Sequence, residues 1–155
     1  MRFRTVLLFV VVALAGYIGY GYAASHFNRA SLVYQNFANA LVRGDADKAR
    51  LFAWDGSALN AFNYSAQRNH DLQGGQIKFE YYDISSFFYS EDGDTATIEA
   101  VHTVRVDPPG TSSVFGAVAV SIPERVEVEQ RDGLWKVKRF DDYYTLNHLK
   151  QPAAQ

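Results

Sequence analysis

The feature that most constrains this chain is an uncharged, apolar run of 18 residues, 5–22, close to the N-terminus. At 1.5 Å per residue a helix of this length spans ~27 Å, which matches the hydrocarbon core of a bilayer. Arg2 and Arg4 stand directly before the run, so the positive-inside rule predicts a cytoplasmic N-terminus. We therefore expect residues 1–25 to form a cytoplasmic tip and a single transmembrane anchor in the lipid bilayer.

A cleaved signal peptide is the alternative, because small residues surround Ala24. Cleavage there would place the bulky Tyr22 at the −3 position, which is unfavourable. Tyr17, Tyr20 and Tyr22 form an aromatic belt at the far end of the run, which favours a retained anchor. In either case the domain that follows lies outside the cytoplasm, facing the periplasm if the membrane is a bacterial inner membrane.

Composition narrows the class of the remaining chain. The protein has 155 residues, of which 48% are hydrophobic, enough for one domain with a core. Without Arg2 and Arg4, 13 basic residues stand against 17 acidic ones, and the resulting charge of −4 argues against a nucleic-acid partner. The absence of cysteine excludes disulfides and Cys-ligated zinc, and the four histidines lack ligand-like spacing. We expect no metal and no cofactor.

The segment after the anchor carries a helical pattern. Its apolar residues recur at steps of three and four, which places them on one helix face: Phe27, Ala30, Tyr34, Phe37, Ala38 and Leu41. Gly44 can end this helix with a left-handed C-cap, and Asp45 can cap a short helix that runs to about Phe52. A third helix is expected to begin at Asp55 or Ser57.

The second half of the domain alternates apolar and polar residues, which predicts β-strands. The stretch Ser113–Gln130 is the longest, and Pro123 within it cannot donate a ladder hydrogen bond, so we expect a bulge that divides the strand. Thr95–Asp107 is predicted as the strand before it, and Leu134–Phe140 as the last strand. The inward face of the earlier strand reads Ala96, Ile98, Ala100, His102, Val104 and Val106.

The first predicted strand changes phase along its length. Ile77, Phe79 and Tyr81 alternate on one parity, and Tyr82, Ile84, Ser86 and Phe88 alternate on the other. A β-bulge near Tyr81–Tyr82 would explain the change. The predicted fold is therefore α+β, with about three helices packed on a curved, antiparallel, four-stranded meander.

Three segments of this pattern, NALVRGDADKARLF, SEDGDTATIEA and RDGLWKVKRF, resemble the nuclear-transport-factor-2-like, cystatin-like cone superfamily. The resemblance covers residues 26–140, within a domain expected to span 26–149 and to be followed by a frayed tail, 150–155. It implies a cone-shaped domain of a superfamily that includes cyclases, isomerases, dehydratases, transport factors and membrane-anchored assembly subunits. One departure is the lack of a clear strand between the second and third helices, where many members have one.

The candidate site follows from His102, the one ionisable residue on the inward face of its strand. In enzymatic branches of the superfamily that this chain resembles, the cone mouth holds an acid or base in an apolar pocket. In this chain the residues that could line such a pocket are Tyr34, Trp54, Tyr81 and Trp135. The alternative is a buried structural histidine, neutral and held by a tyrosine hydroxyl or a backbone group.

A partner carboxylate for His102 is hard to place from the sequence. Glu99 alternates to the outer face, and Glu124 lies next to the expected irregularity at Pro123. No pair of carboxylates is therefore positioned by spacing for acid–base chemistry.

Together these features predict a membrane-anchored, extracytoplasmic binding or assembly domain without catalytic activity, since a tether restricts a domain to one surface. The expected partners are other envelope proteins or a second copy of the chain. The competing hypotheses are an isomerase- or cyclase-like enzyme, or a binder of a small apolar ligand, with a pocket near His102. An open pocket would favour these alternatives, and a closed cone packed with aromatic side chains would argue against them.

The charge asymmetry around the apolar run makes a prediction about topology. A reporter enzyme that works only outside the cytoplasm, fused after Gln155, should be active in cells. Because Arg2 and Arg4 set the orientation, replacing both with Glu should lower that activity. Equal activity of a cytoplasm-dependent reporter at the same position would contradict the predicted topology.

Overall fold

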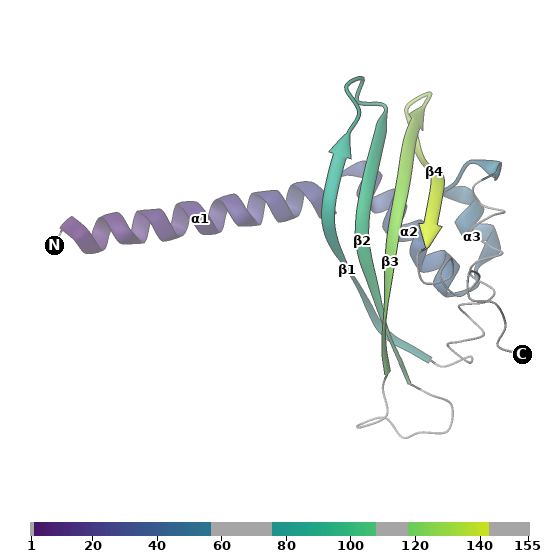
Figure 1. The fold of residues 1–155 in the computed structure, drawn as a ribbon, viewed down its shortest axis with the longest axis horizontal. Coiled ribbons are helices and arrows are strands. Elements are labelled where there is room, and N and C mark those ends of the chain that lie inside the picture. The colour runs from purple at the N-terminus through teal and green to yellow at the C-terminus, as the bar shows by residue number, and fades with distance from the viewer. Residues whose placement is uncertain (1, 57–75, 108–117, 143–155) are drawn as a thin grey trace, which may run out of the picture.

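The computed structural model describes residues 2–56, 76–107 and 118–142. In these ranges the named helices are α1 (Arg2–His26), α2 (Arg29–Val42) and α3 (Ala46–Leu51). The strands are β1 (Gln76–Tyr89), β2 (Thr95–Asp107), β3 (Val118–Arg131) and β4 (Leu134–Asp142). Figure 1 shows α1 projecting away from the domain, while α2 and α3 lie on one side of the sheet. The predicted α+β fold is confirmed.

The two helices of the domain begin and end where their capping residues are. The Asn28 side chain accepts a hydrogen bond from the backbone nitrogen of Ser31 at the start of α2. Gly44 follows the helix with a φ of 67°, and the Asp45 side chain accepts from the backbone nitrogen of Lys48 at the start of α3. The predicted caps are thus confirmed. Of the third helix expected for the domain, only residues 55–56 are among the described residues. The expected tail, 150–155, lies outside them.

A short connection after α3 adds to the sheet in a way the sequence did not reveal. Ala53 forms an isolated parallel bridge with Val137 of β4. The backbone nitrogen of Trp54 donates to the carbonyl of Val137 at 2.9 Å, and the nitrogen of Val137 donates to the carbonyl of Phe52 at 2.8 Å. A single bridged residue gives no alternating pattern, which is why no strand was predicted there.

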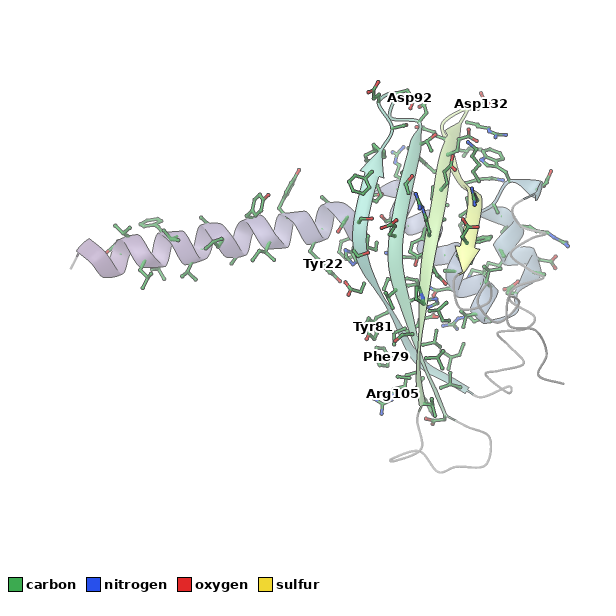
Figure 2. The ribbon with its side chains drawn as sticks, in the orientation of Figure 1. Tyr22, Phe79, Tyr81, Asp92, Arg105 and Asp132 are labelled. Carbon is green, nitrogen blue, oxygen red and sulfur yellow. The ribbon has the colours of Figure 1, made fainter. Side chains whose placement is uncertain are left out.

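The four strands form an antiparallel meander in the order β1-β2-β3-β4. The two hairpin turns that join β1 to β2 and β3 to β4 have positive φ at Gly93 and Gly133, as the Asp-Gly sequences favour. Figure 2 shows Asp92 and Asp132 at the tips of these turns, at the same end of the sheet. The predicted inward face of β2 is buried from Ala96 to Val106.

The prediction of a bulge at Tyr81–Tyr82 is wrong. Strand β1 instead has two irregularities, one before and one after this pair of residues. The register against β2 shifts between Ile77 and Phe79 and again between Ile84 and Ser86. Each bulge inserts one unpaired residue and so exchanges the faces of the residues that follow. As a result Tyr81 and Phe79 lie on the exposed face of the sheet.

The predicted break at Pro123 is also wrong, since β3 pairs with β2 without a register shift from Val118 to Glu129. The backbone N–H of Gln130 donates to the carbonyl of Asp94, the residue just before β2. Backbone N–H groups alternate between the two sides of a strand, so the nitrogen of Pro123 faces the β4 side. The last described pair between β3 and β4 is formed by Glu124, and Pro123 lies one residue past it. Proline therefore removes no ladder hydrogen bond from the described sheet, and the strand continues through it.

The core lies between α2 and the inward face of the sheet. Its fully buried side chains come from both layers: Tyr34, Phe37 and Leu41 of α2, and Ile98, Val126, Val128 and Val137 of the strands. Phe37 packs edge-to-face on Phe140 of β4, with ring centroids 5.4 Å apart. Trp135 packs against this core while only partly buried, on the same face as Val137, because the two residues are two positions apart in β4.

Trp135 and its neighbour give a matched test of the strand faces. We expect Trp135→Ala to lower the free energy of unfolding by about 2 kcal/mol, below the ~3–5 kcal/mol of a fully buried ring. Leu134→Ala, on an exposed side chain, should change it little. Denaturant unfolding of both variants measures the difference. Equal effects would mean that the faces of β4 are assigned wrongly.

Candidate functional site

The candidate site is centred on His102, in the middle of β2. Its side chain has no exposed surface. Its Cα partners are Tyr82 of β1 and Ile122 of β3, so it lies between the two neighbouring strands on the inward face. The ring of Tyr82 stacks on the imidazole, with centroids 4.4 Å apart and planes 17° apart. The expected burial of this histidine agrees with this geometry, whereas Tyr82 contacts it by ring stacking and donates its hydroxyl to the carbonyl of Gln35.

Two carboxylates flank the imidazole, one at each ring nitrogen. The Nε2 atom of His102 lies 3.4 Å from Oε2 of Glu80, and the Nδ1 atom lies 3.7 Å from Oε1 of Glu124. Glu80 pairs with Val104 and Glu124 pairs with Ala100, so both glutamates are diagonal neighbours of His102 on the same face. The side chain of Glu124 is fully buried, and that of Glu80 is 12% exposed.

Helix α2 and its C-cap contact both ends of this line of charged groups. The Tyr34 hydroxyl donates to Oε2 of Glu124 at 2.8 Å, in a buried position. At the other end, Nη2 of Arg43 donates to Oε1 of Glu80 at 2.7 Å. The Asn39 amide, oriented with its nitrogen toward Glu80, donates to both carboxylate oxygens at 2.9 and 3.2 Å. The cluster therefore joins α2 to β1, β2 and β3.

The hydroxyl of Tyr82 is also held by α2. It donates to the carbonyl of Gln35 at 3.1 Å and contacts the side chain of Asn39. The same ring packs edge-to-face on Tyr34, with centroids 5.4 Å apart. Tyr82 thus separates His102 from solvent and is fixed on both its face and its edge.

The charge of Glu80 follows from its partners. Burial raises the pKa of this carboxyl. Hydrogen bonds from His102 and Arg43, together with the charges of these groups, lower the pKa by more than burial raises it, so it lies below its usual value of 4.5. The same carboxylate raises the pKa of Arg43. Glu80 is therefore ionised at neutral pH.

The neutral state expected for His102 was inferred from its apolar neighbours on its own strand. The neighbouring strands instead bring a carboxyl group close to each ring nitrogen, so the surroundings of the imidazole are more polar than its own strand suggested.

The structure brings together only part of the predicted pocket. Tyr34 and His102 are joined through Glu124. Tyr81 lies on the opposite, exposed face of the sheet, because the first bulge of β1 comes before it. It therefore cannot line a pocket with His102.

The two tryptophans lie far from His102. Trp135 pairs with Gln130, eight positions along β3 from the partner of His102, which is roughly 26 Å at the rise of a strand. Trp54 lies near the same hairpin, with the guanidinium of Arg131 at 4.7 Å and the ammonium of Lys136 at 5.1 Å from its ring centroid. Trp135 packs edge-to-face on Tyr89, with ring centroids 6.0 Å apart, at the turn end of the sheet.

The sequence did not single out Glu80, Tyr82 or Asn39. A bulge placed at Lys78 would have turned Glu80 and Tyr82 inward. Glu124 shares its parity with Ile122 and Val126, so a strand continued through Pro123 would have placed it on the inward face.

This arrangement has the groups for acid–base chemistry but not the access. His102 and Glu124 are closed to solvent, so a substrate could not contact either group in this conformation. Within the ranges 2–56, 76–107 and 118–142, no group of three or more His, Asp or Glu could hold a metal ion. The cluster is therefore best described as a buried polar network that fixes α2 on the sheet.

Comparison with known proteins identifies the fold. The sequence matches no model of a protein family and no curated protein. The structure is similar to Aln2 from a Streptomyces species, with a TM-score of 0.56 at 10% identity over 77% of this chain and 92% of that chain. At these identities the likeness concerns the fold alone.

Two other solved structures match with lower scores. A putative calcium/calmodulin-dependent protein kinase II association domain from Xanthomonas campestris gives a TM-score of 0.48 at 15% identity, over 70% of this chain and 80% of that chain. An NTF-2-like protein of unknown function from Shewanella oneidensis gives 0.45 at 12% identity, over 72% and 93%. The observed arrangement, with helices on one face of a four-stranded antiparallel meander, agrees with the nuclear-transport-factor-2-like cone fold that the sequence resemblance implied.

The lowered pKa of Glu80 predicts a pH-dependent stability. Ionised Glu80 stabilises the fold above pH 4.5, and this contribution is lost as the pH falls through the folded-state pKa. The difference in melting temperature between the wild type and Glu80→Gln should be full above pH 4.5 and shrink below it. Glu99→Gln, on the outer face, is the matched control and should show a small difference. A Glu80→Gln difference that does not vary with pH would contradict the assignment.

Proposed function

We propose that this protein is a single-pass membrane protein whose extracytoplasmic domain binds or assembles other molecules without catalysis. The proposal rests on the length, apolar character and exposure of α1. Residues Thr5–His26 form a helix long and apolar enough to cross a membrane, and none of its apolar window is buried against the domain. Such a surface in water would be a large exposed apolar patch, so it needs a bilayer around it.

The same helix is compatible with a signal sequence, and the choice of an anchor rests on two features of the chain. Arg2 and Arg4 precede it, and tyrosines gather at its far end. Our proposal therefore treats the helix as a retained anchor, with the N-terminus on the cytoplasmic side.

The closed interior supports a binding role over the enzymatic alternative. An isomerase- or cyclase-like enzyme, or a binder of a small apolar ligand, would need access to the groups around His102. Here His102, Glu124 and Tyr34 are all fully buried. The surface of the domain is therefore the part available to partners, which we expect to be other envelope proteins or a second copy of this chain.

The proposal is tested by two variants of the full-length protein. His102→Gln removes the group between two carboxylates, so we expect it to lower the melting temperature. His102→Gln combined with Glu124→Gln also replaces the buried carboxyl that has lost its neighbour, and should recover part of the loss. Both should restore the phenotype of cells that lack the protein, because neither changes the surface. A folded double variant that fails to do so would favour the catalytic alternative.

A further inference from the structure

Two aromatic side chains and one arginine lie together on the exposed face of the sheet. Phe79 and Tyr81 of β1 are 50% and 48% exposed, and their rings stack with centroids 5.6 Å apart. Arg105 of β2 is the Cα partner of Phe79 and is exposed as well. We call these three residues the β1 patch. Figure 2 shows them at the lower part of the sheet, on the side from which α1 approaches.

The direction of α1 relative to this patch is set by a hydrogen-bonded joint. The Asn28 side chain donates to the carbonyl of Ala24, in the last turn of α1, at 2.8 Å. The same side chain accepts from the backbone nitrogen of Ser31, in the first turn of α2, at 2.8 Å. Gln35 adds its bond to His26. One residue thus caps both helices, and the domain cannot rotate about the joint without breaking these bonds.

This joint determines which edge of the sheet faces the membrane. The helix leaves the bilayer near Tyr22, and its end contacts β1, which is an edge strand. Figure 1 shows the strands running across the direction of α1, with β1 nearest to it and β4 farthest away. If α1 crosses the membrane, the bilayer surface therefore lies beside β1.

We propose that the β1 patch binds the headgroup layer of the same membrane that α1 spans. The inference rests on the proposed role of α1 as an anchor. Aromatic rings favour the membrane–water interface, and Tyr17, Tyr20 and Tyr22 of α1 reach the same boundary. The patch places Arg105 on the membrane side of a domain that is otherwise acidic, which suits anionic phospholipid headgroups. Headgroups would also cover the outer edge of β1, the kind of sheet edge that otherwise offers backbone groups to other chains.

The chain contains no cysteine, so a single introduced cysteine carries a fluorescent label at one known place. Asp83→Cys lies on the exposed face of β1 beside the patch and leaves the patch intact. Leu51→Cys, on an exposed position of α3, is the control on the far side. Gly16→Cys, where an added side chain meets nothing within 4 Å, reports on the anchor itself. The full-length variants are placed in nanodiscs of anionic phospholipid with nitroxide spin labels on the headgroups or the acyl chains.

The proposal predicts that headgroup nitroxides quench the label at position 83 and leave the label at position 51 unchanged. Acyl-chain nitroxides should quench the label at position 16. In the Asp83→Cys background, the double change Phe79→Ser and Tyr81→Ser should reduce the headgroup quenching. Arg105→Gln should weaken its dependence on anionic lipid.

Each failure has a different meaning. Without quenching at position 16 the chain is not anchored, and the proposed function falls together with this inference. Quenching at position 16 without quenching at position 83 overturns the patch proposal alone. The same holds if oxidation of the Asp83→Cys variant links two copies in the absence of lipid quenching, because a second copy would then cover the face. Quenching that the serine variants leave unchanged would mean that the rings do not bind lipid.

Discussion

The position of α2 on the sheet depends on one buried row of ionisable side chains, Glu80, His102 and Glu124, which crosses three strands of the sheet. Removing a carboxylate or an imidazolium from water is costly, and the cost is offset only where partners are supplied. Here the partners come from α2 and its C-cap, through Tyr34 at one end and Arg43 at the other. The row therefore determines where α2 can lie on the sheet more strictly than apolar contacts alone would. The burial of His102 is consistent with the same contacts, because Tyr82 is held between α2 and the imidazole.

A buried polar network and an exposed apolar helix suggest different tasks for the two parts of the chain. The network joins α2 to three strands of the sheet and stabilises the domain. Helix α1 is long and apolar enough to cross a membrane, and its apolar window is not buried against the domain. The joint at Asn28 makes the two parts one unit, and in our proposal this unit has the edge of the sheet toward the membrane and α3 away from it. A domain held in this way presents a fixed outer surface to partners, which suits binding and assembly.

Much of this fold could be predicted from the sequence, because many of its signals are local. The caps at Gly44 and Asp45 and the alternation of β2 need only a few neighbouring residues to be recognised. The bulges of β1 could not be placed, since a bulge is defined by the register against β2, and Tyr81 was assigned to the wrong face for that reason. At Pro123 the sequence predicted a break that the structure does not have. A proline costs a strand one ladder hydrogen bond only where a neighbouring strand pairs at that position, and this depends on how far β4 extends.

The candidate site shows the same limit. His102 and Tyr34 were found from strand parity and helix periodicity, and they do lie in one network. Glu80 was missed because its inward position depends on the bulge at Lys78. Trp54 and Trp135 are apolar and aromatic like the residues that line pockets, but the pairing of β3 with β4 places them at the other end of the sheet. Residue type indicates which side chains could meet, whereas cross-strand register decides which of them do.

The central claim is that α1 remains part of the mature protein and holds the domain at a membrane. The most direct measurement is the intact mass of the protein recovered from the membrane fraction after alkaline extraction. We expect the full chain of 17.4 kDa in the membrane pellet. A shorter, soluble chain that begins at Ser25 or His26 would show that the helix is a cleaved signal peptide and would contradict the account.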